Sequence, residues 1–342
     1  MTTLRPARLN PGWLTAGIGA VLVALIAGVA LGPVTLPPGS VAAELLNLLP
    51  GVNLTSGLNE REIAIITELR LPRVVLGLLV GAMLSLAGGC YQGVFRNPLA
   101  DPYLLGVAAG AGLGATMAIA FRAGPLLPLA AFAGAGIAVV VTYLLGVAGG
   151  RDRSSATLIL AGVAVSSFLA AIQTYLLQRN VDTIREVYSW LLGRLATNGW
   201  HEVTLLLPYA VVTTVVVLAL RRELDVLSVG DTEAASLGLH PQRSRMILLA
   251  AASLGTAAAV AVSGLIGFVG IIVPHVVRLL AGGSYRSILP LSLLFGAAFL
   301  ALADLFARTL IAPGELPIGV VTAFFGAPFF ILVLRSTRRV SV

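Results

Sequence analysis

The side chains that could carry out covalent or metal chemistry are few in this sequence. All 22 basic residues are arginines, which excludes a phosphate-binding P-loop and Schiff-base chemistry, because both need a lysine amine. One cysteine, Cys90, and three scattered histidines give neither a disulfide framework nor the ligand spacing of a zinc or haem site. We interpret Cys90 as a packing residue and His275, after Pro274, as a helix-end contact. No catalytic residue and no metal ligand is predicted.

Three arginines lie where long apolar runs begin or end. Arg70 and Arg73 precede the second such run, and Arg308 lies near the end of the ninth. At the rim of a protein, an arginine can hold a carboxylate of a partner through two parallel hydrogen bonds, which fixes orientation. The alternative is a local role, because Arg308 follows Asp304 at the spacing of an ion pair on one helix face and long side chains also reach lipid head groups.

The most polar part of the chain is the loop 221–245, which separates two apolar runs. Within it, Asp231 or Thr232 can cap the N-terminus of a short helix, and Gly238 suits the C-terminal end. A short helix held in such a loop can act as a lever for a partner. The alternative is an ordinary amphipathic connector.

A second polar segment, residues 96–102 (RNPLADP), follows an apolar run. Its prolines stop the preceding helix and fix the start of the next, which is a sufficient structural reason for them. Shortly before this turn, Tyr91 and Gln92 are polar side chains within the apolar run, where an unpaired polar group is costly. They either line a watered cavity or form hydrogen bonds between helices, and for Tyr91 we favour the second.

The composition places the chain in lipid. Hydrophobic residues make up 58% of the 342 residues and charged residues only 11%, with a mean hydropathy of +0.97; a soluble domain carries about 25% charged residues. Such a chain has too little polar surface to face water, so we predict an all-α polytopic membrane protein. Arginines in cytoplasmic loops explain the net charge of +7 better than a nucleic-acid partner does.

The apolar runs predict ten spans within a single transmembrane domain, residues 1–342, because each crossing needs about 20 apolar residues. The spans cover residues 14–31, 74–95, 103–121, 126–147, 157–177, 203–220, 246–262, 265–280, 289–310 and 320–334. Only Ser263 and Gly264 separate the seventh span from the eighth. The first span follows Arg5 and Arg8, and we expect an uncleaved helix there rather than a signal peptide.

The arginines also predict an orientation. An even number of spans puts both termini on one side of the membrane. With the N-terminus inside, fourteen arginines fall in inner segments and eight in outer ones, as the positive-inside rule requires. The segment 37–73 then lies outside, with short amphipathic pieces such as residues 41–49, and the loop 221–245 lies in the cytoplasm.

Several motifs, taken together and in order, resemble the FecCD-type permeases, which are the membrane subunits of bacterial ABC importers for iron siderophores, haem and cobalamin. The motifs are RLPR at 70–73, FRNPLADP at 95–102, GLIGFVG at 264–270, VPH at 273–275, AD at 303–304, ELPIG at 315–319 and GAPFF at 326–330. The resemblance extends from about residue 69 to the C-terminus. Its specificity comes from the number and order of the motifs.

The resemblance implies a homodimer of ten-helix subunits with a translocation path along its twofold axis. Two ATP-binding cassette ATPase subunits would lie below it, and an extracytoplasmic substrate-binding protein would dock above. This chain would then be a transporter subunit in the bacterial inner membrane, not an enzyme, with both termini cytoplasmic. It would bind no cofactor, since ATP and Mg would be used by the partner ATPase. The cargo would be a bulky metal chelate, with an iron siderophore ahead of haem and cobalamin.

The resemblance also implies roles for particular residues. Arg70, Arg73 and Arg308 resemble docking points for acidic residues of the binding protein. The coupling helix that contacts the ATPase would comprise Gly230, Asp231, Glu233, Ala234, Ala235, Ser236, Leu237, Gly238 and Leu239. The cytoplasmic gate would comprise Gln92, Asn97, Pro98, Leu99, Ser155 and Ala156. The family often has hydroxyl residues at the last two positions, and Ala156 departs from that pattern.

Two alternatives belong to other functional classes. An ion-coupled secondary transporter of a small organic solute needs acidic residues or histidines within its spans, and of the fifteen acids only Asp304 falls inside a predicted span. An intramembrane enzyme would need a His-Glu zinc motif or paired carboxylates among the spans. The sequence has neither.

Overall fold

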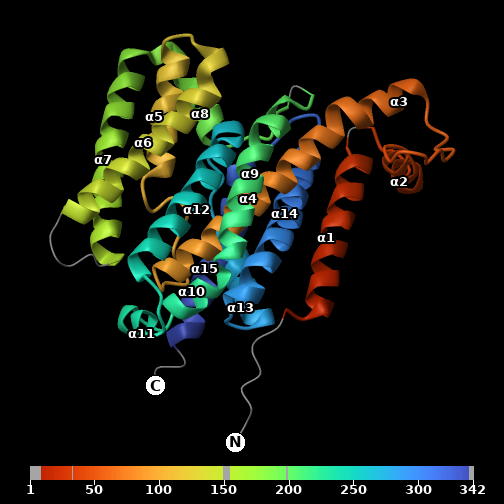
Figure 1. The fold of residues 1–342 in the computed structure, drawn as a ribbon. Coiled ribbons are helices and arrows are strands. Elements are labelled where there is room, and N and C mark those ends of the chain that lie inside the picture. The colour runs from red at the N-terminus through yellow and green to blue at the C-terminus, as the bar shows by residue number, and fades with distance from the viewer. Residues whose placement is uncertain (1–8, 33, 149–154, 198, 339–342) are drawn as a thin grey trace, which may run out of the picture.

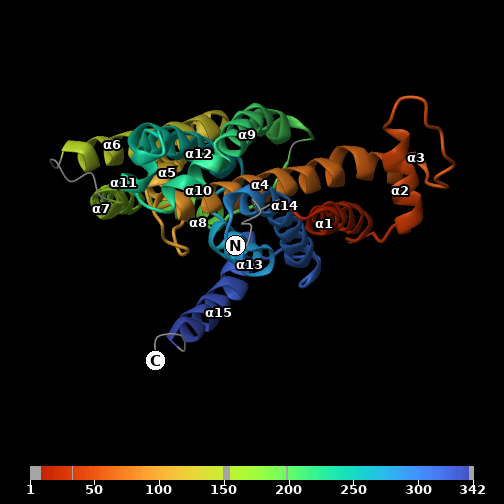
Figure 2. The same cartoon turned by 60° about the horizontal axis from the view of Figure 1, so that its bottom comes forward.

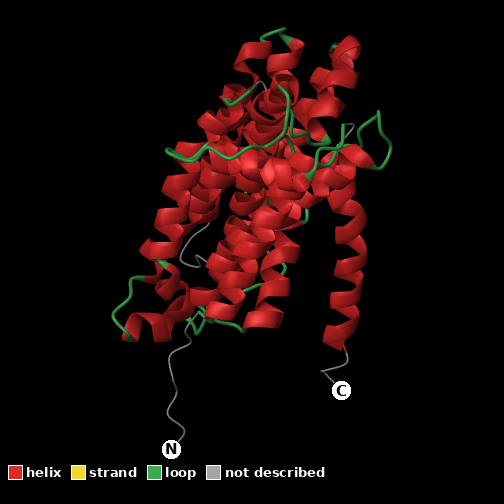
Figure 3. Cartoon of the chain, turned by 90° about the vertical axis from the view of Figure 1, so that its right-hand side faces the viewer, coloured by secondary structure: helices red, strands yellow, loops and turns green. Residues whose placement is uncertain are grey.

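The chain folds into helices joined by short loops. The structure is a computed structural model that describes residues 9–32, 34–148, 155–197 and 199–338, and helix is the only regular secondary structure in these ranges (Figure 3). The all-α prediction is therefore confirmed. Within the described ranges, seven helical segments have the length and apolar composition to cross a membrane, and three shorter apolar helices accompany them.

Ten helices of the described part match the ten predicted spans. They are α1 (Pro11–Ala30), α4 (Leu71–Val94), α5 (Val107–Ala120), α6 (Leu127–Ala148), α7 (Ser155–Arg179), α9 (His201–Ala219), α12 (Pro241–Ser263), α13 (Val269–Ala281), α14 (Tyr285–Thr309) and α15 (Ile318–Arg338). Shorter elements connect them. These are α2 (Pro38–Asn47), α3 (Glu60–Ala64), the π-helix η1 (Ile65–Arg70), the 3-10 helices η2 (Gly124–Leu126) and η3 (Val181–Thr183), α8 (Ile184–Leu191), α10 (Arg221–Leu227) and α11 (Asp231–Ser236).

Two long helices, α4 and α14, pack against each other through the middle of the molecule (Figure 1). On one flank α1 packs on α14, and on the other α5, α6 and α7 pack together, while α15 projects from the body (Figure 2). The start of α1 and the end of α15 lie at the same end as α10 and α11, whereas α2, α3 and α8 lie at the opposite end. We call these the inner end and the outer end, after the orientation that the arginines predict.

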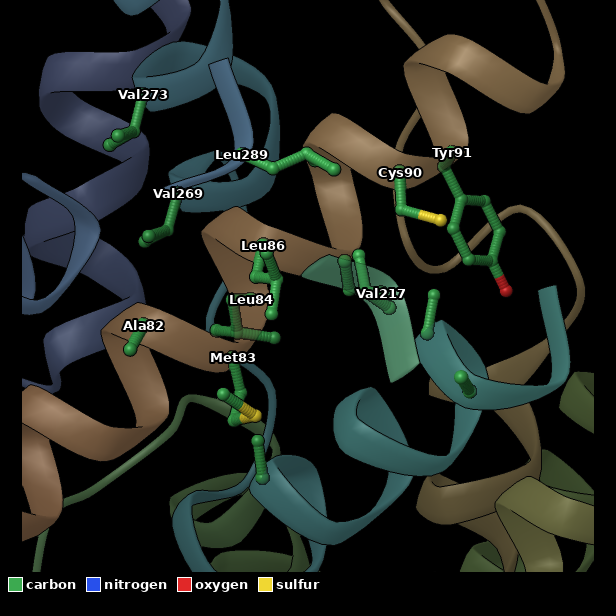
Figure 4. Packing of buried hydrophobic residues seen from close by; sticks show 14 of the residues in the cluster. Ala82, Met83, Leu84, Leu86, Cys90, Tyr91, Val217, Val269, Val273 and Leu289 are labelled. Carbon is green, nitrogen blue, oxygen red and sulfur yellow. The ribbon is translucent and has the colours of Figure 1, made fainter. Parts of the chain in front are cut away.

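Glycines let the central helices approach closely. A Cβ atom at Gly81 of α4 would collide with the carbonyl oxygen of Gly296 in α14, and one at Gly88 with that of Gly270 in α13. Close backbone approach of this kind holds helices together in lipid. The adjoining apolar core encloses Cys90 completely, so its interpretation as a packing residue is confirmed (Figure 4).

The structure corrects the starts of two predicted spans. Helices α5 and α13 each begin later than expected (107 against 103, and 269 against 265), and the residues just before them are irregular. Tyr103 joins the two irregular stretches, because its hydroxyl donates to the carbonyl of Ile266 (3.0 Å) and accepts from the amide of Ile266 (3.2 Å). Irregular backbone at membrane depth persists only where protein groups satisfy it, which this pairing does.

The second predicted span is longer than expected. A continuous helix runs from Glu60 through α3 and η1 into α4 and ends at Val94. It begins with a capping box, in which the side chain of Asn59 accepts from the Glu62 amide (3.0 Å) and the Glu62 carboxylate accepts from the Asn59 amide (2.9 Å). Part of the segment 37–73 therefore extends a spanning helix. The same segment holds α2, where an amphipathic piece was predicted. The short helix α8, between α7 and α9, was not predicted.

Candidate functional site

At the outer end of α4, Arg73 holds two carboxylates at once. Its guanidinium donates to Asp304 of α14 (Nη2–Oδ1, 2.8 Å; Nε–Oδ2, 3.1 Å) and to Glu315, before α15 (Nη1–Oε1, 2.9 Å; Nη2–Oε2, 3.0 Å). The side chain of Asp304 is 2% exposed and that of Glu315 is 53% exposed. The hydrogen bonds from Arg73 lower the pKa of Glu315 below its ordinary value. This cluster fastens α4, α14 and the last loop to one another.

Two further arginines of the outer end, Arg70 and Arg308, are buried and hold the end of α1. Arg70 donates to the carbonyl oxygen of Val29 (2.8 Å), and Arg308 donates to that of Gly28. The last carbonyl groups of a helix lack partners within the helix and carry partial negative charge, so they attract cations. Arg308 also lies 3.6 Å from Asp304, which confirms the predicted four-residue pair.

The three arginines predicted to dock a binding protein are therefore placed differently. Arg73 is partly exposed beside a hollow of about 310 Å³, whose lining also includes Arg194 and Glu315. Arg70 and Arg308 can reach a partner only if their bonds to α1 open. Docking by these residues stays a prediction.

At the inner end, hydrogen bonds within the turn itself hold the predicted gate turn between α4 and α5. The side chain of Asn97 accepts from the amide of Leu99 (2.9 Å), and the carbonyl of Asn97 accepts from the amide of Ala100 (3.1 Å). Asn97 and Pro98 are exposed, and Leu99 is partly buried. Arg96 opens the turn with a left-handed backbone, at φ +50°. The turn therefore presents polar groups to the inner surface as one unit.

The polar side chains near this turn form hydrogen bonds between helices. The hydroxyl of Tyr91 pairs with Ser253 Oγ of α12 at 2.7 Å, which confirms the prediction for Tyr91. Gln92 Nε2 lies within 3.3 Å of the carbonyl of Ile271 in α13.

The helix-end prediction for His275 is wrong. This residue lies in the middle of α13, because α13 continues through Pro274, and its ring packs edge-on against Phe329 of α15 at 5.9 Å.

The other two gate residues lie on a different helix. Ser155 and Ala156 begin α7, which packs on α5 and α6. Ala156 is exposed, and the side chain of Ser155 lies outside the described part. The structure thus brings Asn97, Pro98 and Leu99 into one turn, close after Gln92 in the last part of α4, and places Ala156 on the first turn of a separate helix.

The predicted coupling segment, residues 230–239, forms α11 between two glycines with positive φ. Gly238 (φ +84°) ends the helix as predicted, with the amide of Gly238 bonded to the carbonyl of Ala235 and the amide of Leu239 to that of Ala234, each at 3.0 Å. The predicted N-cap is wrong. Gly230 occupies that position, Asp231 is the first helical residue, and the carboxylate of Asp231 binds Arg245.

Exposed apolar side chains flank α11. Leu237, which follows the helix, is 71% exposed and Val229, which precedes it, 67%, while within the helix the small residue Ala235 is exposed and Ala234 is buried. Apolar side chains gathered on an exposed helix commonly mark a surface that another protein covers. The helix lies at the tip of the inner end (Figure 1).

Solved structures define the class of protein. A metal-chelate type ABC transporter solved in an inward-facing conformation matches the chain with a TM-score of 0.84 at 28% identity, covering 96% of this chain and 100% of that one. PsaBC from Streptococcus pneumoniae shares the fold, with a TM-score of 0.55 at 16% identity over 79% of this chain and 92% of that one. The fold is that of an ABC transporter permease.

The sequence comparisons give the family. The model of the FecCD transport family matches residues 20–336. The cobalamin import permease BtuC of Halobacterium salinarum is 45% identical over 285 residues, 83% of this chain and 76% of that protein. The Fe(3+) dicitrate permease FecD of Escherichia coli is 38% identical over 277 residues, 80% of this chain and 86% of that protein. The chain belongs to the FecCD transport family, and the resemblance drawn from its motifs is confirmed.

Family membership makes the chain a multi-pass membrane permease of an ABC importer, a component that carries no ATPase site of its own.

Sequence reasoning missed the partners of several site residues. We did not predict the ion pair between Arg73 and Glu315 or the one between Asp231 and Arg245. The hydrogen bond between Tyr103 and Ile266 was not predicted either. The only signal available was chemical, since a charged or polar group that folding buries is costly if left unpaired.

Proposed function

We propose that this chain is the permease subunit through which an ABC importer brings a bulky metal chelate into the cytoplasm. Two copies form the membrane channel, two ATPase subunits hydrolyse ATP with Mg²⁺ beneath it, and an extracytoplasmic binding protein delivers the cargo. The complex lies in the bacterial inner membrane with both termini of this chain in the cytoplasm. The permease itself binds no cofactor.

The observation that carries this proposal is the exposed helix α11 at the inner end. Leu237 and Val229, which flank α11, are largely exposed, and the helix lies at the end where α1 begins and α15 ends (Figure 1). A permease without a motor needs a surface of this kind through which a separate ATPase can act. The residues Gly230 to Leu239 supply that surface.

A second copy of the chain fits the unpartnered side of α15. Phe324 of α15 is 74% exposed, and an open apolar groove beside it is lined by Phe268, Leu192 and Val320, among others. Exposed side chains of this size can face lipid or another subunit. The homodimer is favoured because α15 stands away from the body of a single copy (Figure 2), so a second copy can pack along it.

Ion-coupled transport finds no support among the charged groups of the described helices. The carboxylate of Asp304 lies 2.8 Å from Arg73 Nη2 and 3.6 Å from Arg308 Nε. An acid neutralised by two arginines is poorly suited to carry a proton or a cation through each cycle.

The iron chelate is the leading cargo because relatives carry names for iron-chelate transport, and cobalamin is the next candidate because another carries that name. The test reconstitutes the permease with its ATPase and binding protein in proteoliposomes and offers iron siderophore, haem and cobalamin in parallel. We expect ATP-dependent accumulation of the siderophore complex. Accumulation of none of the three chelates would contradict the proposal.

A further inference from the structure

Asp231, the first residue of α11, makes two ion pairs that join the coupling segment to the rest of the inner end. Its carboxylate accepts from Arg245 Nη2 of α12 (2.9 Å to Oδ1 and 3.2 Å to Oδ2). It also lies 3.6 Å from Arg96 Nη2. Arg96 directly precedes Asn97 in the gate turn. One carboxylate therefore touches α12 and the turn between α4 and α5.

The two ion pairs differ in strength. The side chain of Arg245 is 8% exposed, and its Nε has no hydrogen-bond partner among the described residues. Among those residues, Asp231 is the acid that compensates this buried charge, so separating the two is costly. Arg96 is 42% exposed and Asp231 45%, so water and salt weaken that pair, and its two side chains can shift together at little cost.

The gate turn can pass on a displacement because it is bonded internally. The amide of Asn97 bonds to the carbonyl of Gln92 (3.1 Å), and the side chain of Asn97 bonds to the amide of Leu99 (2.9 Å). A shift of Arg96 therefore moves Asn97 and Leu99 with it, instead of being absorbed by a loose loop. Gln92 carries the connection onward to α13 through its bond to Ile271 (3.3 Å).

Two glycines with positive φ join helix α11 to the segments before and after it. Gly230 (φ +144°) and Gly238 (φ +84°) lie on either side of α11, and such backbone conformations are open to glycine at low steric cost. In contrast, α10 is fixed to the start of α14, because Asp225 accepts from the amide of Tyr285 (2.6 Å) and from Ser284 Oγ (2.9 Å). Movement imposed on α11 is therefore directed toward the partners of Asp231.

We propose that Asp231 is the positioning residue that transmits movement of α11 to the gate turn through Arg96, while Arg245 keeps α11 in register on α12. This inference rests on the proposed function, because it takes α11 as the surface that the ATPase contacts. It names a role for one carboxylate within that surface, separate from binding the ATPase.

The first test measures transport and ATP hydrolysis together in the complete complex. We expect Arg96→Gln, which breaks the pair to the gate turn but leaves Asp231 bonded to Arg245, to keep assembly and ATP hydrolysis intact while cargo moved per ATP falls about tenfold, as for residues coupled in one ion-pair network. Asp231→Asn, which also removes the counter-charge of Arg245, should lose at least as much transport, and Asp231→Glu should retain most of it. The matched control is Arg243→Gln, which removes an exposed arginine near Arg245 and should change neither quantity.

The second test follows the gate turn without any cargo. A spin label is placed at Leu99→Cys in a Cys90→Ala background, and its spectrum is recorded before and after the ATPase and nucleotide are added. We expect a spectral change with Arg96 present and none with Arg96→Gln, although the ATPase binds both. An equal change in both, or loss of ATPase binding in Arg96→Gln, would overturn the inference. Failure of the ATPase to bind the unsubstituted permease would refute the proposed function, and this inference with it.

Discussion

The outer and inner ends of the molecule hold their charges in different ways. At the outer end, the buried carboxylate of Asp304 is shared by Arg73 and Arg308, and Arg73 has a second carboxylate in Glu315. At the inner end, the half-exposed carboxylate of Asp231 serves one buried and one exposed arginine.

This difference indicates where the molecule can yield. The outer cluster joins α4, α14 and the last loop through several short bonds around the buried carboxylate of Asp304, and Arg308 extends it to α1, so rearranging it is costly. The pair between Arg96 and Asp231 exchanges with water at little cost. We therefore expect movement that enters at the inner end to pass through this adjustable pair to the gate turn, while the outer end keeps its helices in place.

The largest effect that would test this comparison is expected at Asp304. Asp304→Asn leaves two arginines in the outer cluster without their buried counter-charge, and removing one partner of a buried pair costs about 3–5 kcal/mol. We expect a marked fall in the thermal unfolding temperature in detergent. Glu315→Gln is the matched control, because Glu315 is 53% exposed and an exposed pair contributes about 0–1 kcal/mol. Equal losses in the two variants would show that burial does not distinguish the two acids.

The next effect is expected on coupling at the inner end. Gly238→Val forces a branched residue into a left-handed conformation that costs roughly 1–2 kcal/mol, and this distorts the end of α11. We expect an inserted permease whose ATPase partner hydrolyses ATP without moving cargo.

Gly282→Val is the control for that substitution. Gly282 also has a positive φ (+91°), and as at Gly238 the space where a Cβ atom would lie is open, but it lies outside the coupling segment. Equal transport losses in both variants would mean that backbone strain alone, and not the coupling surface, is responsible.

A moderate effect is expected on docking at the outer end. Arg73→Gln removes the charge but keeps a hydrogen-bond donor for Asp304, and we expect binding-protein affinity to fall by about tenfold, since a rim charge of this kind steers and orients a partner. Glu315→Gln, which removes the competing acid, should strengthen binding. Titration of the binding protein onto the permease in nanodiscs measures both. Arg61→Glu, at an exposed arginine, is the control and should leave the affinity unchanged. Unchanged affinity in Arg73→Gln would count against docking at Arg73.

The smallest effect concerns pH at the gate turn. Burial raises the pKa of Asp101 to about 6 from its ordinary value of 3.8. The folded state therefore binds the proton of the Asp101 carboxyl more tightly than the unfolded state does. The stabilisation of the fold by this protonation is fully present below about pH 4 and is lost as pH rises through about 6. Asp101→Asn keeps an oxygen that can accept from the Tyr103 amide, as Asp101 does at 2.7 Å. We expect it to flatten the unfolding temperature between about pH 4 and 7, whereas Asp182→Asn should not.

Much of the helical architecture could be predicted from the sequence, because hydropathy reports directly which segments need lipid. The glycine end of α11 and the bond of Tyr91 were also predictable, since both follow from local chemistry. The irregular starts of α5 and α13 could not be predicted. The segments that contain Tyr103 and Ile266 are as apolar as the spanning helices that follow them, and the hydrogen bonds between these two residues join positions 163 residues apart.

The site partners were hidden for the same reason. The bond from Arg73 to Glu315 spans 242 residues, and a local pattern such as the four-residue spacing of Asp304 and Arg308 cannot indicate an acid so far away in the sequence. The helical extension before α4 was missed because the charged residues Glu60, Glu62 and Glu68 lower the hydropathy of a segment that is helical nonetheless. Hydropathy measures transfer into lipid, whereas the capping box of Asn59 determines where this helix begins.

The central claim is that the chain conducts cargo but is driven from its inner end. The most direct measurement is uptake against a concentration gradient in proteoliposomes that contain the permease with or without the ATPase, in the presence of the binding protein. The account predicts accumulation only when the ATPase and ATP are both present. Accumulation by the permease without the ATPase, sustained by an imposed ion gradient, would contradict it.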